Sequence, residues 1–141
     1  MFAAVSEFRQ KDSETPVVLM GYANPVVVTG YERFAQLASD AGVDGLLTVD
    51  MPPEEAGELN AALSAKAIDI IYLIAPTTTP ERMKNICANA TGYVYYVSLK
   101  GVTGASNIDI DSVKEKVSEI RQYTDLPVSV GFGIKDNESA K

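Results

Sequence analysis

YVYYVSLKGVTGAS, residues 93–106, is an apolar and aromatic run of strand length that breaks into a turn with few side chains. Four further runs of similar length and hydrophobicity lie along the chain, at residues 16–20, 44–49, 69–74 and 127–132. Each run is continuously apolar rather than alternating in polarity, which is typical of parallel strands covered on both faces. We therefore predict five parallel strands, of which residues 93–98 form the fourth.

Helical patterns separate these strands. The predicted helices cover residues 1–10, 31–41, 54–65, 80–89 and 111–123, and residues 136–141 resemble the first turns of another helix. Thr29 and Glu32 have the spacing of a capping box for the second helix, and Gly42 stands where that helix should end. The alternation of strand and helix predicts an α/β fold with a parallel sheet and right-handed crossovers.

Two architectures fit this order of elements. An open, doubly wound sheet fits a chain of 141 residues, whereas a complete eight-stranded barrel typically needs about 250 residues. The chain ends favour the barrel, because residues 1–10 and 136–141 both resemble parts of helices. The length of the chain favours the open sheet, but its ends indicate a fragment, whose strand edges need further partners.

Composition narrows the functional classes. The formal net charge of −7 provides no basic field for nucleic acid. The sequence has neither a run approaching about 18 apolar residues nor a signal-peptide pattern, so we expect a cytoplasmic protein without a membrane partner.

The single cysteine, Cys87, excludes an internal disulfide and lies in an apolar helical pattern, so we expect it to be buried. The absence of histidine excludes Ser–His and Cys–His catalysis and His-ligated metals.

Two glycine pairs follow the fourth and fifth predicted strands. In both candidate folds, ligands bind beyond the carboxyl ends of the strands. Gly101 with Gly104 and Gly131 with Gly133 would let backbone N–H groups approach an anion such as a phosphate. The alternative is that each pair only forms a tight turn.

Four side chains at the same strand ends are candidates for ligand contacts. Asp50 could bind a polar ligand group or cap the helix that follows it. Tyr22 and Tyr95 could form the walls of a site for a flat apolar ligand or could be ordinary packing residues. Lys100 could bind an anion, form a Schiff base or remain a solvated loop charge.

Several of these motifs together resemble one family. The stretches that carry the resemblance are residues 18–25, 41–55, 75–78, 92–98, 101–104 and 125–134. In this order and spacing they resemble the tryptophan synthase alpha subunit. The resemblance implies a (β/α)8 barrel of which this chain, as a single incomplete domain over residues 1–141, holds strands three to seven and lacks strands one, two and eight.

The resemblance also implies an activity and a partner. The family is a lyase of tryptophan biosynthesis that cleaves indole-3-glycerol phosphate to indole and glyceraldehyde 3-phosphate by a retro-aldol reaction. The implied partner is the beta subunit, which holds pyridoxal phosphate, whereas the alpha chain needs no metal or cofactor. The catalytic glutamate and aspartate of the family would precede Met1, so we expect this chain alone to be inactive.

The resemblance assigns roles to individual positions. It implies that Tyr22, Asp50 and Tyr95 surround the indole and its N–H, and that Leu47 and Ile74 are apolar lining. The residues matched to the closing loop and the phosphate cradle are Thr103, Gly104, Phe132 and Gly133. The loops at residues 24–25 and 52–53 would lie towards the subunit interface.

Three other interpretations remain open. A different phosphate-binding barrel lyase or isomerase would share the glycine-rich turns, but residues 52–55 and 101–104 together would be unexpected in it. A non-catalytic alpha-like protein could bind the partner alone. A receiver-like signalling module would need acidic residues after its first strand, where this chain has Gly21, Tyr22, Ala23 and Asn24.

Overall fold

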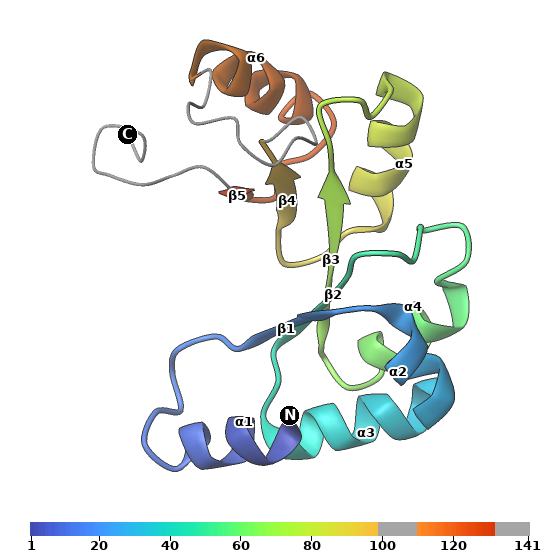
Figure 1. Ribbon diagram of the computed structural model, residues 1–141, viewed down its shortest axis with the longest axis vertical. Coiled ribbons are helices and arrows are strands. Elements are labelled where there is room, and N and C mark those ends of the chain that lie inside the picture. The colour runs from blue at the N-terminus through green and yellow to red at the C-terminus, as the bar shows by residue number, and fades with distance from the viewer. Residues whose placement is uncertain (99–109, 132–141) are drawn as a thin grey trace. The chain divides into compact units, whose positions relative to one another are not determined.

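The structure is a computed structural model that describes residues 1–98 and 110–131 (Figure 1). Its contacts divide the chain into two compact units, Met1–Ile71 and Tyr72–Lys141, and we describe each unit by itself. The boundary falls inside β3 (Asp69–Ile74). The prediction of a single incomplete domain stays a prediction.

The first unit contains strand–helix repeats in chain order. Its elements are α1 (Phe2–Arg9), β1 (Val18–Gly21), α2 (Ala23–Thr29), α3 (Tyr31–Ala41), β2 (Gly45–Thr48), α4 (Gly57–Ser64) and the first half of β3. Helix α3 contacts α1, α2 and α4, and Figure 1 shows α1 and α3 side by side. The rings of Phe2 and Phe34 meet edge to face at 5.4 Å, which fixes α1 against α3.

The second unit continues the same alternation. After the second half of β3 come α5 (Pro80–Asn89), β4 (Val94–Val97), α6 (Ile110–Ile120) and β5 (Val128–Gly131). Thr79 accepts a hydrogen bond from the N–H of Arg82, and Pro80 occupies the first turn, so α5 starts as the sequence predicts.

The strands pair in chain order, β1-β2-β3-β4-β5, and the pairings between the described residues are parallel. A doubly wound sheet reverses its strand order at a switch point, whereas successive strands of a barrel are neighbours throughout. The observed order therefore favours the barrel over the open sheet. The five predicted strands are confirmed, although most are shorter than the apolar runs that predicted them.

Strand β2 explains why the apolar runs are continuous. Its neighbours Leu46 and Leu47 point to opposite faces of the sheet, and both are buried. Burial on both faces is the property that the continuous hydrophobicity predicts. Cys87 is also buried, as expected, and burial raises the pKa of its thiol.

The ends of α3 confirm one prediction and correct another. Gly42 adopts a left-handed conformation, and Gly42 N–H and Val43 N–H donate to the carbonyls of Ser39 and Ala38 in a Schellman motif. The predicted capping box of Thr29 and Glu32 is wrong. Gly30 precedes the helix without a side-chain cap, and the Thr29 hydroxyl donates instead to the carbonyl of Pro25 within α2.

Two further helix predictions need correction. Helix α2 was not predicted, because Pro25 and the valines at 26–28 disfavour a helix locally. Helix α4 begins at Gly57 rather than at Glu54, because residues 53–55 form a turn after the two prolines.

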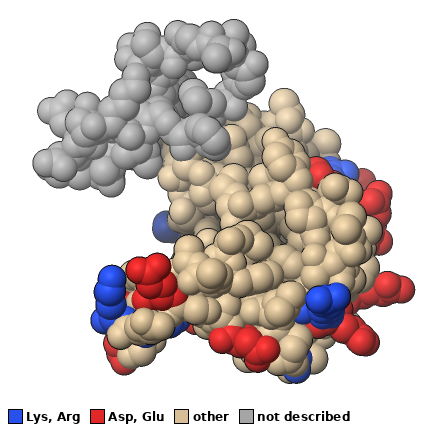
Figure 2. Space-filling model, turned by 60° about the horizontal axis from the view of Figure 1, so that its bottom comes forward, with Lys and Arg blue, Asp and Glu red and all other residues tan. Residues whose placement is uncertain are grey.

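The surface carries charged side chains of both signs, and the expectation that the chain binds no nucleic acid stays a prediction. On the face shown in Figure 2, basic side chains stand singly among acidic and uncharged ones. A polyphosphate backbone requires a continuous basic surface instead. Among the described residues, no helix is long and apolar enough to cross a membrane.

Candidate functional site

Tyr22 and Asp50 follow the carboxyl ends of two paired strands in the first unit. Gly21 pairs with Thr48 in the β1–β2 register, and the N–H of Val49 donates to the carbonyl of Gly21 at 2.9 Å. The side chain of Tyr22 is 68% exposed. An exposed aromatic ring at the ligand-binding end of a parallel sheet has the chemistry of a wall for a flat apolar ligand.

Asp50 has a structural partner that the sequence did not predict. Its Oδ1 accepts a hydrogen bond of 2.7 Å from the N–H of Ala23, the first residue of α2. Asp50 therefore caps the helix after the neighbouring strand and not the helix that follows it in sequence. The expectation that it caps the following helix is corrected accordingly, while its expected contact with an indole N–H stays a prediction.

Leu47 and Ile74 lie within strands. Leu47 is 1% exposed in β2 of the first unit, and Ile74 is 0% exposed at the end of β3 in the second unit. Both are core residues of their units in this structure. Their expected contact with a substrate stays a prediction.

Tyr95 of β4 lies over the last residue of β5 in the second unit. A Cβ built on Gly131 would stand 1.7 Å from the hydroxyl oxygen of Tyr95 and 2.1 Å from the ring carbon that carries it. The carbonyl of Gly131 accepts hydrogen bonds from the N–H of Ser98 at 3.1 Å and from its hydroxyl at 2.8 Å. Gly131 thus leaves the space that the Tyr95 ring occupies.

The remaining predicted residues lie outside the part of the chain that the structure describes. These are Lys100, Gly101, Thr103, Gly104, Phe132 and Gly133. The phosphate cradle and the closing loop therefore stay predictions from the sequence.

Two tyrosines, Tyr93 before β4 and Tyr96 within it, have raised pKa values. Burial first, and the neighbouring Tyr95 second, raise the pKa of Tyr93. Burial first, and the carboxylate of Glu119 second, raise the pKa of Tyr96. Raised pKa values favour the neutral phenols, so these residues can donate hydrogen bonds but are poor general bases near neutral pH. Among the described residues, no three Cys, Asp or Glu side chains are grouped to hold a metal ion.

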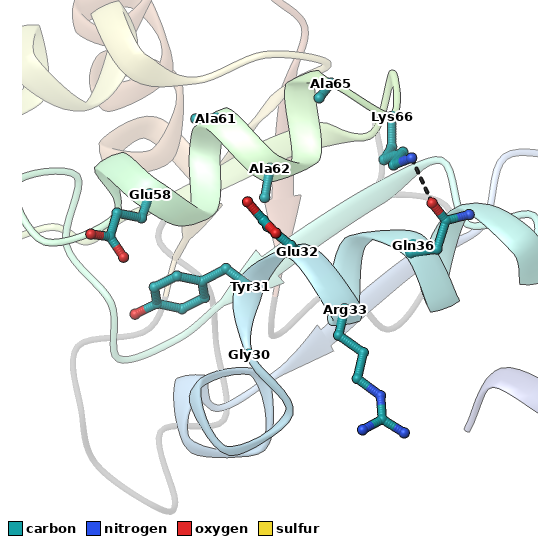
Figure 3. A pocket seen from close by; sticks show the side chains of 10 residues that line it. All are labelled: Gly30, Tyr31, Glu32, Arg33, Gln36, Glu58, Ala61, Ala62, Ala65 and Lys66. Carbon is teal, nitrogen blue, oxygen red and sulfur yellow. Dashed lines mark hydrogen bonds between the residues drawn. The ribbon is translucent and has the colours of Figure 1, made fainter.

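A groove of about 1120 Å³ lies between α3 and α4 (Figure 3). Alanines of α4 form one wall, and the ammonium of Lys66 donates to the amide oxygen of Gln36 across the groove at 2.6 Å. Figure 3 shows Glu32 directed towards Ala62 and Arg33 directed away from α4. Of the predicted substrate residues that the structure describes in the first unit, Tyr22, Leu47 and Asp50, none lines this groove.

Comparison with known proteins identifies the family. The family model described as "Tryptophan synthase alpha chain" matches residues 1–141. The chain belongs to the tryptophan synthase alpha chain family. The resemblance noted in the sequence is confirmed by this match.

Curated relatives from two bacteria illustrate the similarity. The tryptophan synthase alpha chain of Nitrosococcus oceani is 57% identical over 140 residues, which are 99% of this chain and 52% of the relative. That of Thioalkalivibrio sulfidiphilus is 60% identical over 136 residues, which are 96% of this chain and 51% of the relative. The chain thus spans about half the length of the curated tryptophan synthase alpha chains that it matches.

Solved structures support the fold. A chain of the tryptophan synthase α2β2 complex from Pyrococcus furiosus matches with a TM-score of 0.87 and 39% identity, over 97% of this chain and 55% of that chain. A structure from Aquifex aeolicus matches with a TM-score of 0.86 and 37% identity, over 99% of this chain and 52% of that chain. With the sequential order of parallel strands, this likeness shows that the fold is part of a (β/α)8 barrel.

Two features of the site were not found from the sequence. The Ala23 N–H belongs to a helix that local propensities disfavour, and Gly131 was considered only as half of a glycine pair that binds a phosphate or forms a tight turn. The one feature of the sequence that could have indicated Ala23 and Gly131 is their position at strand ends. Ligands of (β/α)8 barrels bind at the carboxyl ends of the strands.

Proposed function

We propose that this chain forms the substrate wall of a tryptophan synthase alpha protein, a lyase that cleaves indole-3-glycerol phosphate to indole and glyceraldehyde 3-phosphate. The observation that carries the proposal is the family match over residues 1–141. Tyr22 contributes an exposed ring at the end of β1, and Tyr95 contributes a ring beside Gly131. In the proposal these two rings contact the indole, with Thr103 and Gly104 closing over the phosphate.

The proposed chemistry needs proton transfer at the indole ring and at a substrate hydroxyl. Carboxylates can perform both steps without a histidine or a metal ion. The glutamate and aspartate that the family resemblance assigns to these steps match no position of this chain. We therefore propose that the chain binds and orients the substrate but does not cleave it without the catalytic glutamate and aspartate.

The proposed partner is a tryptophan synthase beta subunit, which would hold the pyridoxal phosphate. The similar Pyrococcus furiosus chain belongs to a tryptophan synthase α2β2 complex. On this chain, α2 exposes Val27 at 50% and Val28 at 77%. Residues 24–25, which were predicted as a loop and which the resemblance assigns to the interface, lie in the same helix. Exposed aliphatic side chains on one short helix suit an apolar partner surface. A cytoplasmic location stays a prediction.

Titration with indole-3-propanol phosphate tests the proposal. This analogue keeps the indole and the phosphate but has no bond that retro-aldol cleavage can break. In an amide NMR spectrum of the chain, we expect shifts at Tyr22 and Tyr95 that saturate, with small changes along the α3–α4 groove. The absence of saturable shifts at millimolar analogue, or saturable shifts confined to the groove, would contradict the proposal.

A further inference from the structure

Tyr22 is tethered on both sides by the short segment that follows the neighbouring strand β2. Before it, the carbonyl of Gly21 accepts a hydrogen bond of 2.9 Å from the N–H of Val49. After it, the N–H of Ala23 donates 2.7 Å to Oδ1 of Asp50. Val49 and Asp50 are successive residues after β2, so one short segment holds both sides of Tyr22.

Helix α2 has a sequence of low helix propensity and no side-chain cap from its own N-cap residue. Tyr22 is its N-cap residue and provides no side-chain hydrogen bond to the helix. The seven residues ANPVVVT include a proline and four β-branched side chains, which have low helix propensity. The carboxylate of Asp50 supplies the acceptor that the N-cap residue lacks.

We propose that Asp50 is a positioning residue that sets the orientation of the Tyr22 ring and of α2 together. Its hydrogen bond fixes the plane of the Tyr22–Ala23 peptide and hence the backbone torsions on either side of it. The direction of the Tyr22 side chain and the start of α2 both follow from those torsions. The nature of the ligand at Tyr22 rests on the proposed function, but the positioning role does not.

The proposal links the ligand-binding end of β1 to the exposed face of α2. Val27 and Val28 lie on the same seven-residue helix whose first N–H is bound by Asp50. A substitution of Asp50 should therefore alter the positions of both Tyr22 and the exposed valines, because the same peptide holds both. Because an amide oxygen accepts the same hydrogen bond, asparagine should perform this role nearly as well as aspartate.

Hydrogen exchange of the backbone amides tests the positioning role without any ligand. We compare Asp50→Ala, which removes the acceptor, with Asp50→Asn, which keeps an acceptor of the same shape. Asp50→Ala should speed exchange in α2 by about fivefold or more, whereas Asp50→Asn should stay within about twofold of the parent chain. Glu55→Ala, which removes an exposed carboxylate from the same connection, is the matched control, and the amides of β2 report whether each variant remains folded.

Titration of the same variants with indole-3-propanol phosphate tests the effect on Tyr22. Asp50→Ala should weaken the affinity for the analogue, measured from the saturable shift at Tyr22, by about tenfold. Asp50→Asn should keep the affinity of the parent chain. Unchanged α2 exchange in Asp50→Ala would overturn the proposal, as would equal loss of affinity in both variants with normal α2 exchange, since that result indicates direct contact between the carboxylate and the ligand. If the parent chain binds no analogue, the proposed function fails, and the exchange result still decides the positioning role.

Discussion

The hydroxyl of Tyr95 occupies the position that a side chain on Gly131 would need. The distance from that hydroxyl oxygen to an added Cβ would be 1.7 Å, far inside any tolerated contact, and the ring itself is also too close. Tyr95 pairs with Ser129 in the β4–β5 register, so neither strand can move aside without loss of its ladder. The two residues therefore form one packing unit at the end of the sheet.

Gly131→Ala should displace the Tyr95 ring and lower the free energy of unfolding by about 1–3 kcal/mol. Tyr95→Ala in the same chain should relieve the overlap, so the double variant should lose at least about 1 kcal/mol less than the sum of the single variants. Urea denaturation of the four chains measures this coupling. Gly21→Ala is the matched control at the end of β1, where an added Cβ meets nothing within 4 Å. Additive losses would contradict the packing unit.

Ala67 offers a substitution that should stabilise the chain. It has a φ of 54° and ends α4 in a Schellman motif, with the N–H groups of Ala67 and Ile68 donating to the carbonyls of Ser64 and Leu63. An alanine in this conformation is strained and glycine is not, so Ala67→Gly should raise the free energy of unfolding by about 0.5–1 kcal/mol.

The same substitution two residues earlier should act in the opposite direction. Ala65 has a right-handed helical conformation, with a φ of −62°. Ala65→Gly should therefore lower the free energy of unfolding by about 0.5–1 kcal/mol. If both glycine variants are destabilised in thermal unfolding, the strain at Ala67 is not relieved by glycine.

Arg9 joins α1 to the start of β2. Its Nε donates to the carbonyl of Gly42 at 2.8 Å, one terminal nitrogen donates to the carbonyl of Thr15 at 2.8 Å, and the other pairs with the carboxylate of Asp44. The Arg9 side chain is 17% exposed, and its loss leaves the partly buried carbonyl of Gly42 without its donor. We expect Arg9→Ala to lower the free energy of unfolding by about 2–3 kcal/mol.

Arg9→Lys should not restore this stability, because an ammonium group lacks the planar fork that reaches three acceptors. The control is Lys11→Ala, which removes an exposed ion pair to Glu7 at 4.0 Å and should change stability by less than about 0.5 kcal/mol. Denaturant unfolding of the three variants measures both effects. Full recovery with lysine would show that charge alone matters at this position.

Asp12 makes the stability of the folded chain depend on pH. The N–H of Thr15, the hydroxyl of Thr15 and the N–H of Glu14 donate to its carboxylate and hold its pKa below the ordinary value of 3.8. A lowered folded-state pKa contributes stability that is present above the unfolded value and is lost as pH falls through the folded value. Asp12→Asn should therefore make unfolding less dependent on pH below about 4.

Thr15→Val tests the cause of that pKa shift. The variant keeps the N–H donors but removes the hydroxyl donor, so the pKa of Asp12 should rise towards 3.8 without reaching it. Carboxyl NMR titration of Asp12 in both chains measures the change. An unchanged pKa in the Thr15→Val chain would mean that the hydroxyl does not contribute.

The strands could be predicted from the sequence because each is marked by a run of apolar residues within the strand itself. Continuous burial on both faces requires apolar residues in succession, and β2 and β3 show that pattern in the sequence. The end of α3 was equally local, since the left-handed residue that closes it is the glycine at position 42.

The missed features depend on residues that are distant in sequence. Helix α2 has poor local propensity, and Asp50, 27 residues after Ala23, holds its start. The Tyr95–Gly131 contact likewise requires knowledge that β4 and β5 are neighbours in register. The failed capping box at Thr29 has a local origin instead, because the Thr29 hydroxyl donates to the carbonyl of Pro25 within α2.

The central claim is that this chain forms the substrate wall of a tryptophan synthase alpha protein. The most direct test replaces the matching part of the Nitrosococcus oceani alpha chain, 57% identical over 140 residues, with this sequence. The measurement is indole release from indole-3-glycerol phosphate by the purified chimera. We expect release within about tenfold of the parent alpha chain, and at least about tenfold slower release with Gly131→Ala in the chimera. A folded chimera that releases no indole would contradict the account.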